Sequence, residues 1–593
     1  MCGIFGYIGT GDARRYIING LKRLEYRGYD SWGVAVAVNN TIDVKKMVGA
    51  IGTFKDIESL PYSHIGIGHT RWATHGGVTE NNAHPHFSSD KKFMLAQNGI
   101  VENYQNLKEM LTKEGYKFET ETDTEIIVRL IEKKLKNKAY DLKEAVRSAF
   151  LDLKGRNTII LLEQSGKHMI AVKNGSPLVL GLGKDELFIA SDTLSFADKT
   201  DKVVFVNNNE MIEFKNDEIG LYKIQTGGKI ELKVTTLDHA DTTIDKEGFK
   251  HFMIKEIVEQ KHTIKEAVTY SRQELMPIIK AINAADTVYT VGAGTAGYSA
   301  AQIAFFLRSI AGIKAIELKS YEIGSYERLF SSKDLILAVS QSGETADTIE
   351  ALEIAKRSGT KIASLVNMLG STVTRMSDYP YYSRSGPEIC VVSTKVFTSQ
   401  LAWGYYLSYS LLGKTQGEKA KTELHTISKY LESLFTDKLF SQVKSIIEKY
   451  ITKKSHLFIL GKDQNYNISL EAALKMKEAT YKHFEGFAAG ELKHGVIALI
   501  EKGTPVFVIV SNDKFESDIL SAAAEVKARG AKVIGIAKEP NELFDETIIV
   551  KDFGKADSIV NIVPFHLLSY HLSVKLGYNP DKPRNLAKSV TVK

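Results

Sequence analysis

The sequence predicts a multidomain α/β and α+β protein, in which stacked β-sheets with outer helices come first and two doubly wound parallel sheets follow. Three observations lead to this prediction. Short β-type runs alternate with helical patterns over the first 240 residues, a strand, loop and helix pattern recurs beyond residue 280, and this second pattern occurs twice. A chain of 593 residues is long enough for roughly three or four domains.

Composition and charge are those of a globular protein from a reducing compartment. Hydrophobic residues make up 43% of the chain and charged residues 25%. The formal net charge of +6 comes from 77 basic and 71 acidic residues spread along the whole chain, so we expect no nucleic-acid partner. Two cysteines cannot build a disulfide framework, and no signal peptide or apolar run of ~18 residues is present, so we expect a cytoplasmic location and no membrane partner.

Residues 1–240 form the first predicted domain. Helical patterns run from Ala13 to Leu24, from Tyr104 to Thr112 and from Thr124 to Leu135, with β-type runs such as GVAVAV, HIGIGHT and NTIILLEQ between them. This order indicates stacked sheets with helices outside. Residues 241–280 begin with polar, unpatterned sequence and are predicted to form a linker and a leading helix.

The second half contains an internal duplication. The segment LAVSQSG around Ser340 matches VIVSNDK around Ser511, and RSGTKIASL matches ARGAKVIGI at the same offset of 171 residues. This offset is far longer than the period of a solenoid repeat. We therefore predict two related parallel-sheet domains at residues 281–425 and 450–580, followed by a tail at residues 581–593.

Two loops in the first of these domains indicate a phosphate ligand. A G-x-G-x-x-G pattern begins at Gly292, and Glu317 follows at the spacing of a dinucleotide-binding fold, so a nicotinamide cofactor is one interpretation. Both this loop and the next strand-to-helix loop carry side chains that suit a compact phosphomonoester at a helix N-terminus. These side chains are Thr295, Ser340, Gln341, Ser342 and Thr345. Each cluster alone is typical of helix capping, but together they favour a sugar-phosphate pocket.

The second of these domains carries a charged helical stripe. Glu471, Lys475 and Glu478 are spaced by four and three residues, which places them on one face of a helix. A solvated face with an ion pair is the ordinary interpretation, whereas in a pocket such a carboxylate could move a proton between neighbouring carbons. His494 could open a sugar ring as a neutral imidazole, and Lys588 near the end of the chain could form a Schiff base.

Cys2 directly follows Met1. If Met1 is removed, the thiol and the free α-amine belong to one residue, and the amine can accept the thiol proton without a separate histidine. A small hydrophobic residue at the start of a strand is the alternative interpretation of Cys2.

Other residues of the first domain could bind an amino acid. Arg71 could pair with the α-carboxylate and Asp123 with the α-ammonium group, and Asn98 with Gly99 could supply an oxyanion hole. Four histidines in the same region match no zinc pattern and have no cysteine beside them, so we predict no metal site. They are His69, His75, His84 and His86.

The motifs of the chain together resemble one known family. The segments MCGI, LEYRGYDS, HTRWATHG, QNG, ETDTE, SQSGETADT, STKVFTSQ, ALKMKE, AAGELKHG and PRNLAKSVTV occur in the order found in the glutamine–fructose-6-phosphate aminotransferase (isomerising) family. The resemblance extends from end to end. It implies an N-terminal-nucleophile glutaminase domain with four αββα layers, followed by two sugar isomerase (SIS) domains.

The resemblance implies two linked half-reactions. In the first, Cys2 attacks the glutamine amide, with Asn98 and Gly99 as the oxyanion hole, and Trp72 gates a channel that delivers ammonia. The implied glutamine-binding residues are Arg71, Thr74, His75 and Asp123. A channel keeps the amine unprotonated until it reaches the sugar site.

The second implied half-reaction uses fructose 6-phosphate. Its implied phosphate-binding residues are Thr295, Ser340, Gln341, Ser342 and Thr345. The resemblance assigns ring opening to His494, imine formation at C2 to Lys588, proton transfer between C1 and C2 to Glu478, and supporting positions to Glu471 and Lys475. It implies no dissociable cofactor, and it implies a homodimer.

One position departs from the family pattern, and three alternative functions stay open. Ala296 stands where a serine hydroxyl would help to hold phosphate, so we expect weaker sugar-phosphate affinity.

The alternatives are a glutaminase whose isomerase half is a deglycase or aminates another keto sugar phosphate, an enzyme that uses a nicotinamide cofactor, and a non-catalytic sugar-phosphate sensor. The complete set around Cys2 speaks against a sensor.

Overall fold

The computed structural model describes residues 2–237 and 245–591 of the chain. Contacts divide the chain into two compact units, Met1–Ile244 with Ala587–Lys593, and Asp245–Leu586. Each unit is described separately below. Residues 241–244 of the predicted linker lie outside the described residues, and the predicted leading helix region contains α5 (Phe252–Glu266) and α6 (Arg272–Ala284).

The described part of the first unit contains two antiparallel sheets. One sheet has eight strands in the order β15 (Thr235–Thr236), β11 (Lys202–Phe205), β9 (Val179–Leu182), β10 (Glu186–Ala190), β1 (Gly3–Gly9), β4 (Ile65–Arg71), β2 (Ser31–Val38) and β3 (Thr41–Val48). The other has seven strands in the order β14 (Lys229–Ile230), β13 (Glu218–Lys223), β12 (Glu210–Lys215), β8 (His168–Asn174), β7 (Asn157–Glu163), β6 (Phe93–Gly99) and β5 (His86–Phe87).

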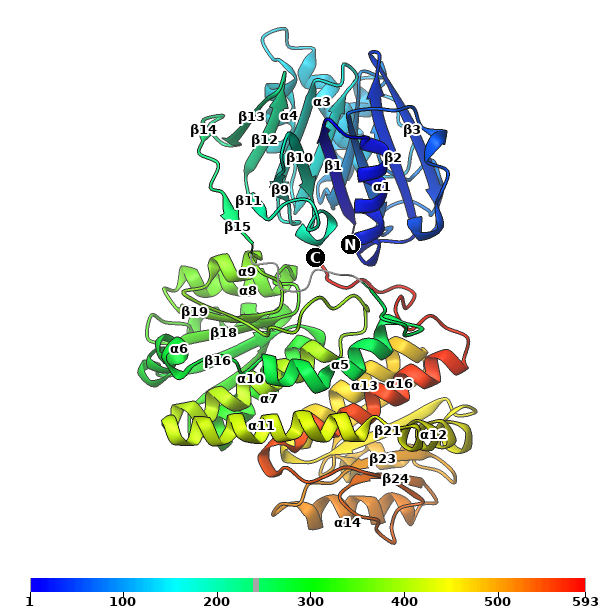
Figure 1. Cartoon of the computed structure of the whole chain (residues 1–593), viewed down its shortest axis with the longest axis vertical. Coiled ribbons are helices and arrows are strands. Elements are labelled where there is room, and N and C mark those ends of the chain that lie inside the picture. The colour runs from blue at the N-terminus through cyan, green and yellow to red at the C-terminus, as the bar shows by residue number, and fades with distance from the viewer. Residues whose placement is uncertain (1, 238–244, 592–593) are drawn as a thin grey trace. The chain divides into compact units, whose positions relative to one another are not determined.

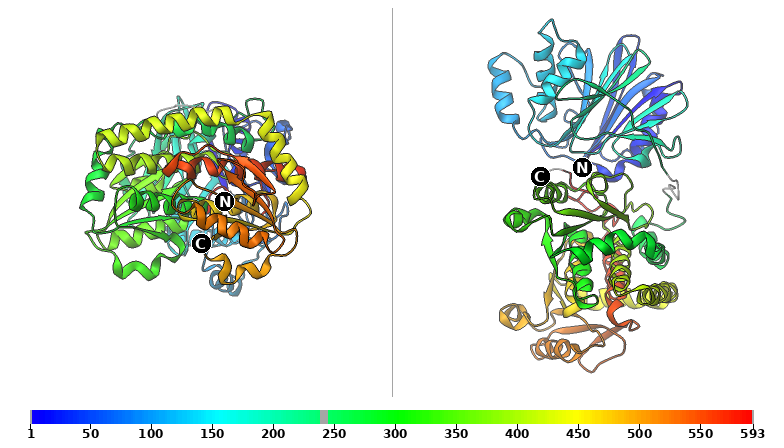
Figure 2. Two further views of the ribbon diagram at one scale, coloured as in Figure 1. Left: turned by 90° about the horizontal axis from the view of Figure 1, so that it is seen from below. Right: turned by 90° about the vertical axis from the view of Figure 1, so that its left-hand side faces the viewer.

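The first unit has four layers. Helix α1 (Ala13–Arg23), which is capped by the Asp12 side chain, packs on the eight-stranded sheet. Ile4, Met94 and Ile160 belong to a core between the two sheets. The outer face of the seven-stranded sheet is covered by α2 (Tyr104–Lys113), α3 (Thr124–Leu135) and α4 (Leu142–Leu151), which are the light-blue helices of Figure 2. The central strands β1, β2 and β7 are buried along nearly their whole length, because layers cover both of their faces, whereas the edge strand β3 is partly exposed. The αββα prediction is confirmed.

The second unit contains two parallel sheets with the same strand order. The first sheet consists of β17 (Ala315–Lys319), β16 (Val288–Gly292), β18 (Leu335–Ser340), β19 (Lys361–Val366) and β20 (Tyr379–Tyr382). The second consists of β22 (His483–Ala488), β21 (His456–Gly461), β23 (Pro505–Ile509), β24 (Lys532–Ala537) and β25 (Glu546–Ile549). The predicted pair of doubly wound domains is thus confirmed.

Helices between the two sheets join the lobes of this unit. One hydrophobic core includes Leu337 of the first sheet, Trp403 and Phe565 of the helices, and Ile459 of the second sheet. Figure 1 shows α5 and the central helices between the sheets. The further helices of the unit are α7 (Gly294–Ser309), α8 (Ala346–Arg357), α9 (Thr372–Met376), α10 (Lys395–Leu411), α11 (Lys414–Leu434), α12 (Asp437–Ile446), α13 (Tyr466–Thr480), α14 (Glu516–Lys527), α15 (Asp557–Asn561) and α16 (Val563–Lys575). Helix α7, which begins in the first predicted phosphate loop, packs on α13, which carries the charged stripe.

Candidate active sites

Cys2 immediately precedes β1 and lies against the backbone of Trp72. The Trp72 amide N–H donates to Cys2 Sγ at 3.3 Å, and the thiol lies 3.6 Å from the Trp72 carbonyl oxygen. Burial raises the pKa of the Cys2 thiol, and the Trp72 amide and Arg71 oppose this rise. A thiol with a raised pKa needs a neighbouring base to become a nucleophile.

Arg71 at the end of β4 organises the following turn. Its guanidinium donates to the carbonyl oxygens of His75 at 2.5 Å and of Gly77 at 3.0 Å. Thr74 in this turn is exposed, and the His75 ring meets Tyr104 edge-on with centroids 5.0 Å apart. The structure therefore brings the predicted residues Arg71, Thr74 and His75 together on one turn.

Asn98 and Gly99 form the end of β6. Asn98 Nδ2 donates to Ser191 Oγ at 2.9 Å, and this hydroxyl also accepts from the Ile4 amide at 2.9 Å. Gly99 has φ +126°, and a Cβ there would lie 2.0 Å from the Arg156 carbonyl oxygen. Only glycine fits this position, so its backbone is held in a fixed orientation next to the Asn98 amide.

Asp123 is the N-cap residue of α3 and lies in a buried position. Its Oδ2 accepts from the Val101 amide at 2.8 Å. Burial raises the pKa of the Asp123 carboxyl, while the Val101 amide, His75 and the Gln97 side chain oppose the rise. Because Asp123 also influences the pKa of Cys2, the predicted glutamine-binding carboxylate and the predicted nucleophile lie near each other.

In the second unit, the charged stripe of α13 is buried. Lys475 Nζ lies 2.5 Å from Glu478 Oε2 and 3.6 Å from Glu471 Oε1. The side chains of Glu471 and Lys475 are 0% and 1% exposed, and that of Glu478 is 20% exposed. The stripe is therefore not a solvated face. Burial raises the pKa of Glu471 to about 8, with Lys475 opposing the rise and Glu478 adding to it.

Thr295 connects this stripe to the first predicted phosphate loop. It lies in the first turn of α7, where backbone amides have no intrahelical acceptor, and its hydroxyl donates to Glu471 Oε1 at 3.1 Å. In the second loop, Ser340 Oγ accepts from the Gly343 amide at 2.9 Å and closes the turn. The further predicted residues of this loop are Gln341, Ser342 and Thr345, and Thr345 is the N-cap residue of α8. Thr295 thus links the first predicted loop to the charged stripe of α13.

Neither His494 nor Lys588 belongs to α13 or to the two predicted phosphate loops. His494 ends the short helix Leu492–His494 and is exposed. Lys588 belongs to the segment Ala587–Lys593, which contacts assign to the first unit. Their roles in ring opening and imine formation stay predictions.

Several residues near the sites were not predicted. Ser191 orients Asn98 from 93 residues away, and no sequence pattern indicates this pairing. Glu388 accepts from the Thr394 amide at 2.9 Å and influences the pKa of Lys475. His566 is fully buried on α16, and burial next to Lys475 lowers its pKa to about 3. A histidine in the apolar sequence of α16 is typical of a core residue, so sequence offers no signal.

The buried pKa shift of Glu471 leads to a stability prediction. An unfolded chain ionises this carboxyl near pH 4.5, whereas the folded protein keeps its proton up to about pH 8. Unfolding between these values releases a proton, so the free energy of unfolding falls as the pH rises. We expect Glu471→Gln to melt a few degrees above wild type at pH 8 and to lose this advantage near pH 5, measured by calorimetry. A difference in Tm that is equal at both pH values would contradict the shift.

The structure does not favour the interpretation as a dinucleotide-binding loop, because the carboxylate of Glu317 is already paired with an arginine. Glu317, which would bind a ribose hydroxyl, is exposed on β17 and forms an ion pair with Arg308 at 2.8 Å. Within the described residues, no group of three or more His, Cys, Asp or Glu side chains could hold a metal ion.

None of the helices in the ranges 2–237 and 245–591 combines the length and apolar character needed to cross a membrane.

Comparison with known proteins shows relatives along the whole chain. The SIS domain model matches residues 281–408 and 450–571, and the glutamine amidotransferase domain model matches residues 69–198. Proteins named glutamine–fructose-6-phosphate aminotransferase (isomerizing) from Thermococcus kodakarensis and Aquifex aeolicus are 40% and 39% identical, and each alignment covers both chains completely. A solved structure, the C-terminal domain of glucosamine-fructose-6-phosphate aminotransferase from Francisella tularensis, is 30% identical with a TM-score of 0.53, and the match covers 57% of this chain and all of that one. The chain therefore belongs to the glutamine–fructose-6-phosphate aminotransferase (isomerising) family.

Proposed function

We propose that this protein transfers the amide nitrogen of glutamine to fructose 6-phosphate and isomerises the product, giving glucosamine 6-phosphate and glutamate. The observation that carries the proposal is the presence of both sets of residues in one chain. The first unit holds a partly buried thiol beside a cation and a carboxylate, and the second holds a buried carboxylate–lysine pair beside a predicted phosphate loop.

The first half-reaction begins at Cys2. Once Met1, which lies outside the described residues, is removed, the α-amine of Cys2 accepts the thiol proton and the thiolate attacks the amide carbon of glutamine. Asn98 and Gly99 donate to the oxyanion, and Arg71 and Asp123 hold the α-carboxylate and α-ammonium groups. The protonated α-amine of Cys2 then gives its proton to the leaving nitrogen, the C–N bond breaks and ammonia departs, and water hydrolyses the remaining glutamyl thioester to glutamate. Thr74 and His75 complete the glutamine-binding set, and Trp72 gates the path of the ammonia.

The second half-reaction takes place at α13. Thr295 and the loop residues Ser340, Gln341, Ser342 and Thr345 hold the phosphate. After His494 assists ring opening, Lys588 Nζ condenses with the C2 carbonyl and loses water, and ammonia then displaces the lysine from C2.

The isomerisation completes this half-reaction. Glu478 removes a proton from C1 and returns it to C2, which converts the ketose imine into a 2-amino aldose. Lys475 lies between the two carboxylates and forms an ion pair with Glu478, and the raised pKa of Glu471 leaves that group neutral at pH 7.

The proposed assembly and compartment follow from single residues. His494 is exposed on its own chain, so we propose a homodimer in which it reaches the sugar site of the second copy. Cys2 must stay a free thiol, which a reducing cytoplasm maintains. Light scattering at several protein concentrations tests the dimer.

The experiment that tests this function is formation of glucosamine 6-phosphate by the purified protein from glutamine and fructose 6-phosphate, without added nicotinamide or metal. Glutamate and amino sugar in equal amounts support the proposal. Glutamate without amino sugar would mean that the acceptor sugar is wrong, and the absence of both products would contradict the proposal.

Ala296 gives a prediction for sugar affinity. It is the third residue of α7, where a serine hydroxyl could donate to a phosphate bound at the helix N-terminus. We expect Ala296→Ser to lower the KM for fructose 6-phosphate by about threefold to tenfold, the value of one hydrogen bond. The same change at exposed Ala528 serves as the control. An unchanged KM in Ala296→Ser would count against the phosphate-binding role of this loop.

A further inference from the structure

Asp123 lies between two threonines in sequence, and each threonine is hydrogen-bonded to a buried histidine. Thr122 Oγ1 lies 2.9 Å from His86 Nε2, and Thr124 Oγ1 lies 2.9 Å from His84 Nε2. All four side chains belong to buried residues. We propose that His84 and His86 are positioning residues that hold the Asp123 carboxylate in place for the α-ammonium group of the substrate. This inference rests on the proposed glutaminase function.

The donor and the acceptor of each hydrogen bond of His84 can be assigned from its neighbours. The Thr124 hydroxyl donates to Gln97 Oε1 at 2.5 Å, so its oxygen accepts the Nε2–H of His84. His84 Nδ1 then carries no proton and accepts the Gln97 backbone N–H at 3.4 Å. One neutral tautomer of His84 therefore satisfies every contact at both ring nitrogens.

Gln97 extends this link to the two predicted functional groups. Its Nε2 donates to Asn157 Oδ1 at 2.7 Å, which fixes the orientation of the side-chain amide. It precedes Asn98 on β6, and its side chain is one of the groups that favour the ionised form of Asp123. His84 thus ties the oxyanion strand to the residue that begins α3.

The second histidine holds the other side of Asp123. The Thr120 hydroxyl donates to Glu125 Oε2 at 2.9 Å, and its oxygen lies 3.0 Å from Thr122 Oγ1. Thr122 therefore donates to Thr120 and accepts the Nε2–H of His86. The chain of donors runs from His86 through both threonines to the Glu125 carboxylate.

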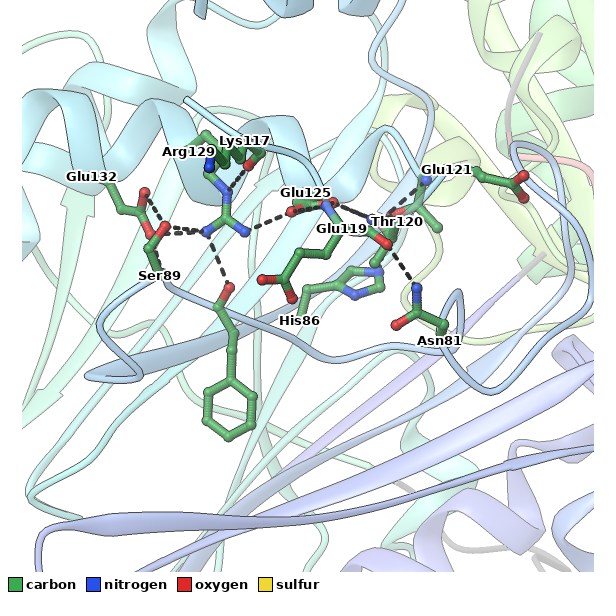
Figure 3. Close-up of polar contacts among 12 residues, drawn as sticks. Asn81, His86, Ser89, Lys117, Glu119, Thr120, Glu121, Glu125, Arg129 and Glu132 are labelled. Carbon is green, nitrogen blue, oxygen red and sulfur yellow. Dashed lines mark hydrogen bonds and ion pairs between the residues drawn. The ribbon is translucent and has the colours of Figure 1, made fainter. Parts of the chain in front are cut away.

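The Glu125 carboxylate, which accepts the last hydrogen bond of this series, is itself held by several contacts. It accepts from the backbone amides of Glu119 and Thr120 at 2.9 Å and 2.7 Å, and it pairs with Arg129 at 2.6 Å inside the unit. Figure 3 shows Glu125 between Arg129 and the segment 119–121, with His86 beside them. Residues Glu119, Thr120 and Thr122 before α3 are thus connected by hydrogen bonds to the Glu125–Arg129 pair.

Both imidazoles are neutral, as these tautomers require. Burial and the neighbouring histidines hold the pKa of His84 well below its usual range, and burial with Lys46 and Arg71 does the same for His86. The rings of His84 and His86 lie 4.9 Å apart, so two protons on the pair would repel each other.

The test compares two substrates that differ only in the α-ammonium group. Glutamine carries it, and 4-carbamoylbutanoate has the same amide and carboxylate without it. His84→Gln places an N–H donor near the position of Nε2, within reach of Thr124. The shorter amide of His84→Asn lies near the position of Nδ1, where its oxygen can accept the Gln97 N–H but its NH2 group does not reach Thr124. Glutamate or glutarate release gives kcat and KM for each substrate and variant.

We expect His84→Asn to lose about tenfold or more in kcat/KM for glutamine, mainly through KM, and less than twofold for 4-carbamoylbutanoate. His84→Gln is expected to stay within about threefold of wild type for both substrates. Thr124→Val, which removes the hydroxyl at nearly constant volume, is expected to act like His84→Asn. His86→Asn and Thr122→Val test the second branch in the same way.

The matched control is His168→Asn, which removes a buried imidazole that lies 3.0 Å from Glu213 Oε1 in the same unit. It is expected to lower Tm without changing the ratio of the two specificity constants. If His84→Asn and Thr124→Val both kept the wild-type ratio of kcat/KM for glutamine to kcat/KM for 4-carbamoylbutanoate, whether through no loss or through equal losses for both substrates, the inference would be overturned and the proposed function would stand. A wild-type protein that released no glutamate from glutamine would overturn the proposed function together with the inference.

Discussion

Cys2→Ala is expected to abolish glutamate release and glutamine-dependent formation of the amino sugar, with a loss of about 10³-fold or more. The thiol is the nucleophile of the proposed mechanism, and alanine removes only its sulfur. Because the two contacts of the Cys2 sulfur with the Trp72 backbone, at 3.3 and 3.6 Å, are weak, we expect Tm to change little. Glutamate release is followed by an enzyme-coupled assay, and Tm by calorimetry.

The chain provides a matched control for this variant. Cys390 is the other cysteine of the sequence and is buried in the second unit. Cys390→Ala makes the same chemical change in the other unit, so we expect it to keep the rate of glutamate release. Cys2→Ala protein that retained a tenth of the wild-type rate would contradict the assignment of the nucleophile.

Glu478→Gln is expected to separate the two half-reactions. The amide has the shape of the carboxylate but cannot take the C1 proton, so amino sugar formation is expected to fall by about 10²- to 10⁴-fold. Glutamate release should stay within about threefold of wild type, because the substitution lies in the second unit. Both products are measured in the same reaction mixture.

We expect the Glu478→Gln protein to fold, because Lys475 keeps a second carboxylate, Glu471, beside it. Glu471 lies 3.6 Å from Lys475 and can take over as its ionised partner when Glu478 is neutral. Glu432→Gln, an exposed position in the same unit, is the control and is expected to leave both rates unchanged. A Glu478→Gln protein that still made the amino sugar at the wild-type rate would rule out Glu478 as the base.

The elements with strong local signals could be predicted from sequence. The helix predicted from Thr124 to Leu135 has those bounds in the structure, and the one predicted from Ala13 ends one residue earlier, at Arg23. Their apolar periodicity and the Asp12 cap are local properties. The strand order of the antiparallel sheets could not be predicted in this way. Strand β1 pairs with β10, about 180 residues away, and nothing in the sequence of either strand specifies that partner.

The candidate sites show the same division. The spacing of Glu471, Lys475 and Glu478 predicts one helical face, but whether that face is buried depends on what packs against it. Ser191 and His84 act through hydrogen bonds to residues far away in sequence, which no spacing rule contains. The histidines that match no zinc pattern became informative only when their partners were known.

The most direct test of the account is the origin of the nitrogen in the product. The protein is given glutamine labelled with ¹⁵N in the side-chain amide, fructose 6-phosphate and an excess of unlabelled ammonium chloride, and the amino sugar is analysed by mass spectrometry. We predict glucosamine 6-phosphate that is almost fully ¹⁵N-labelled, because ammonia released at Cys2 reaches the sugar without mixing with the solvent. Product with the isotope content of the bulk ammonium would contradict the channel, and labelled glutamine that yields no amino sugar would contradict the central claim.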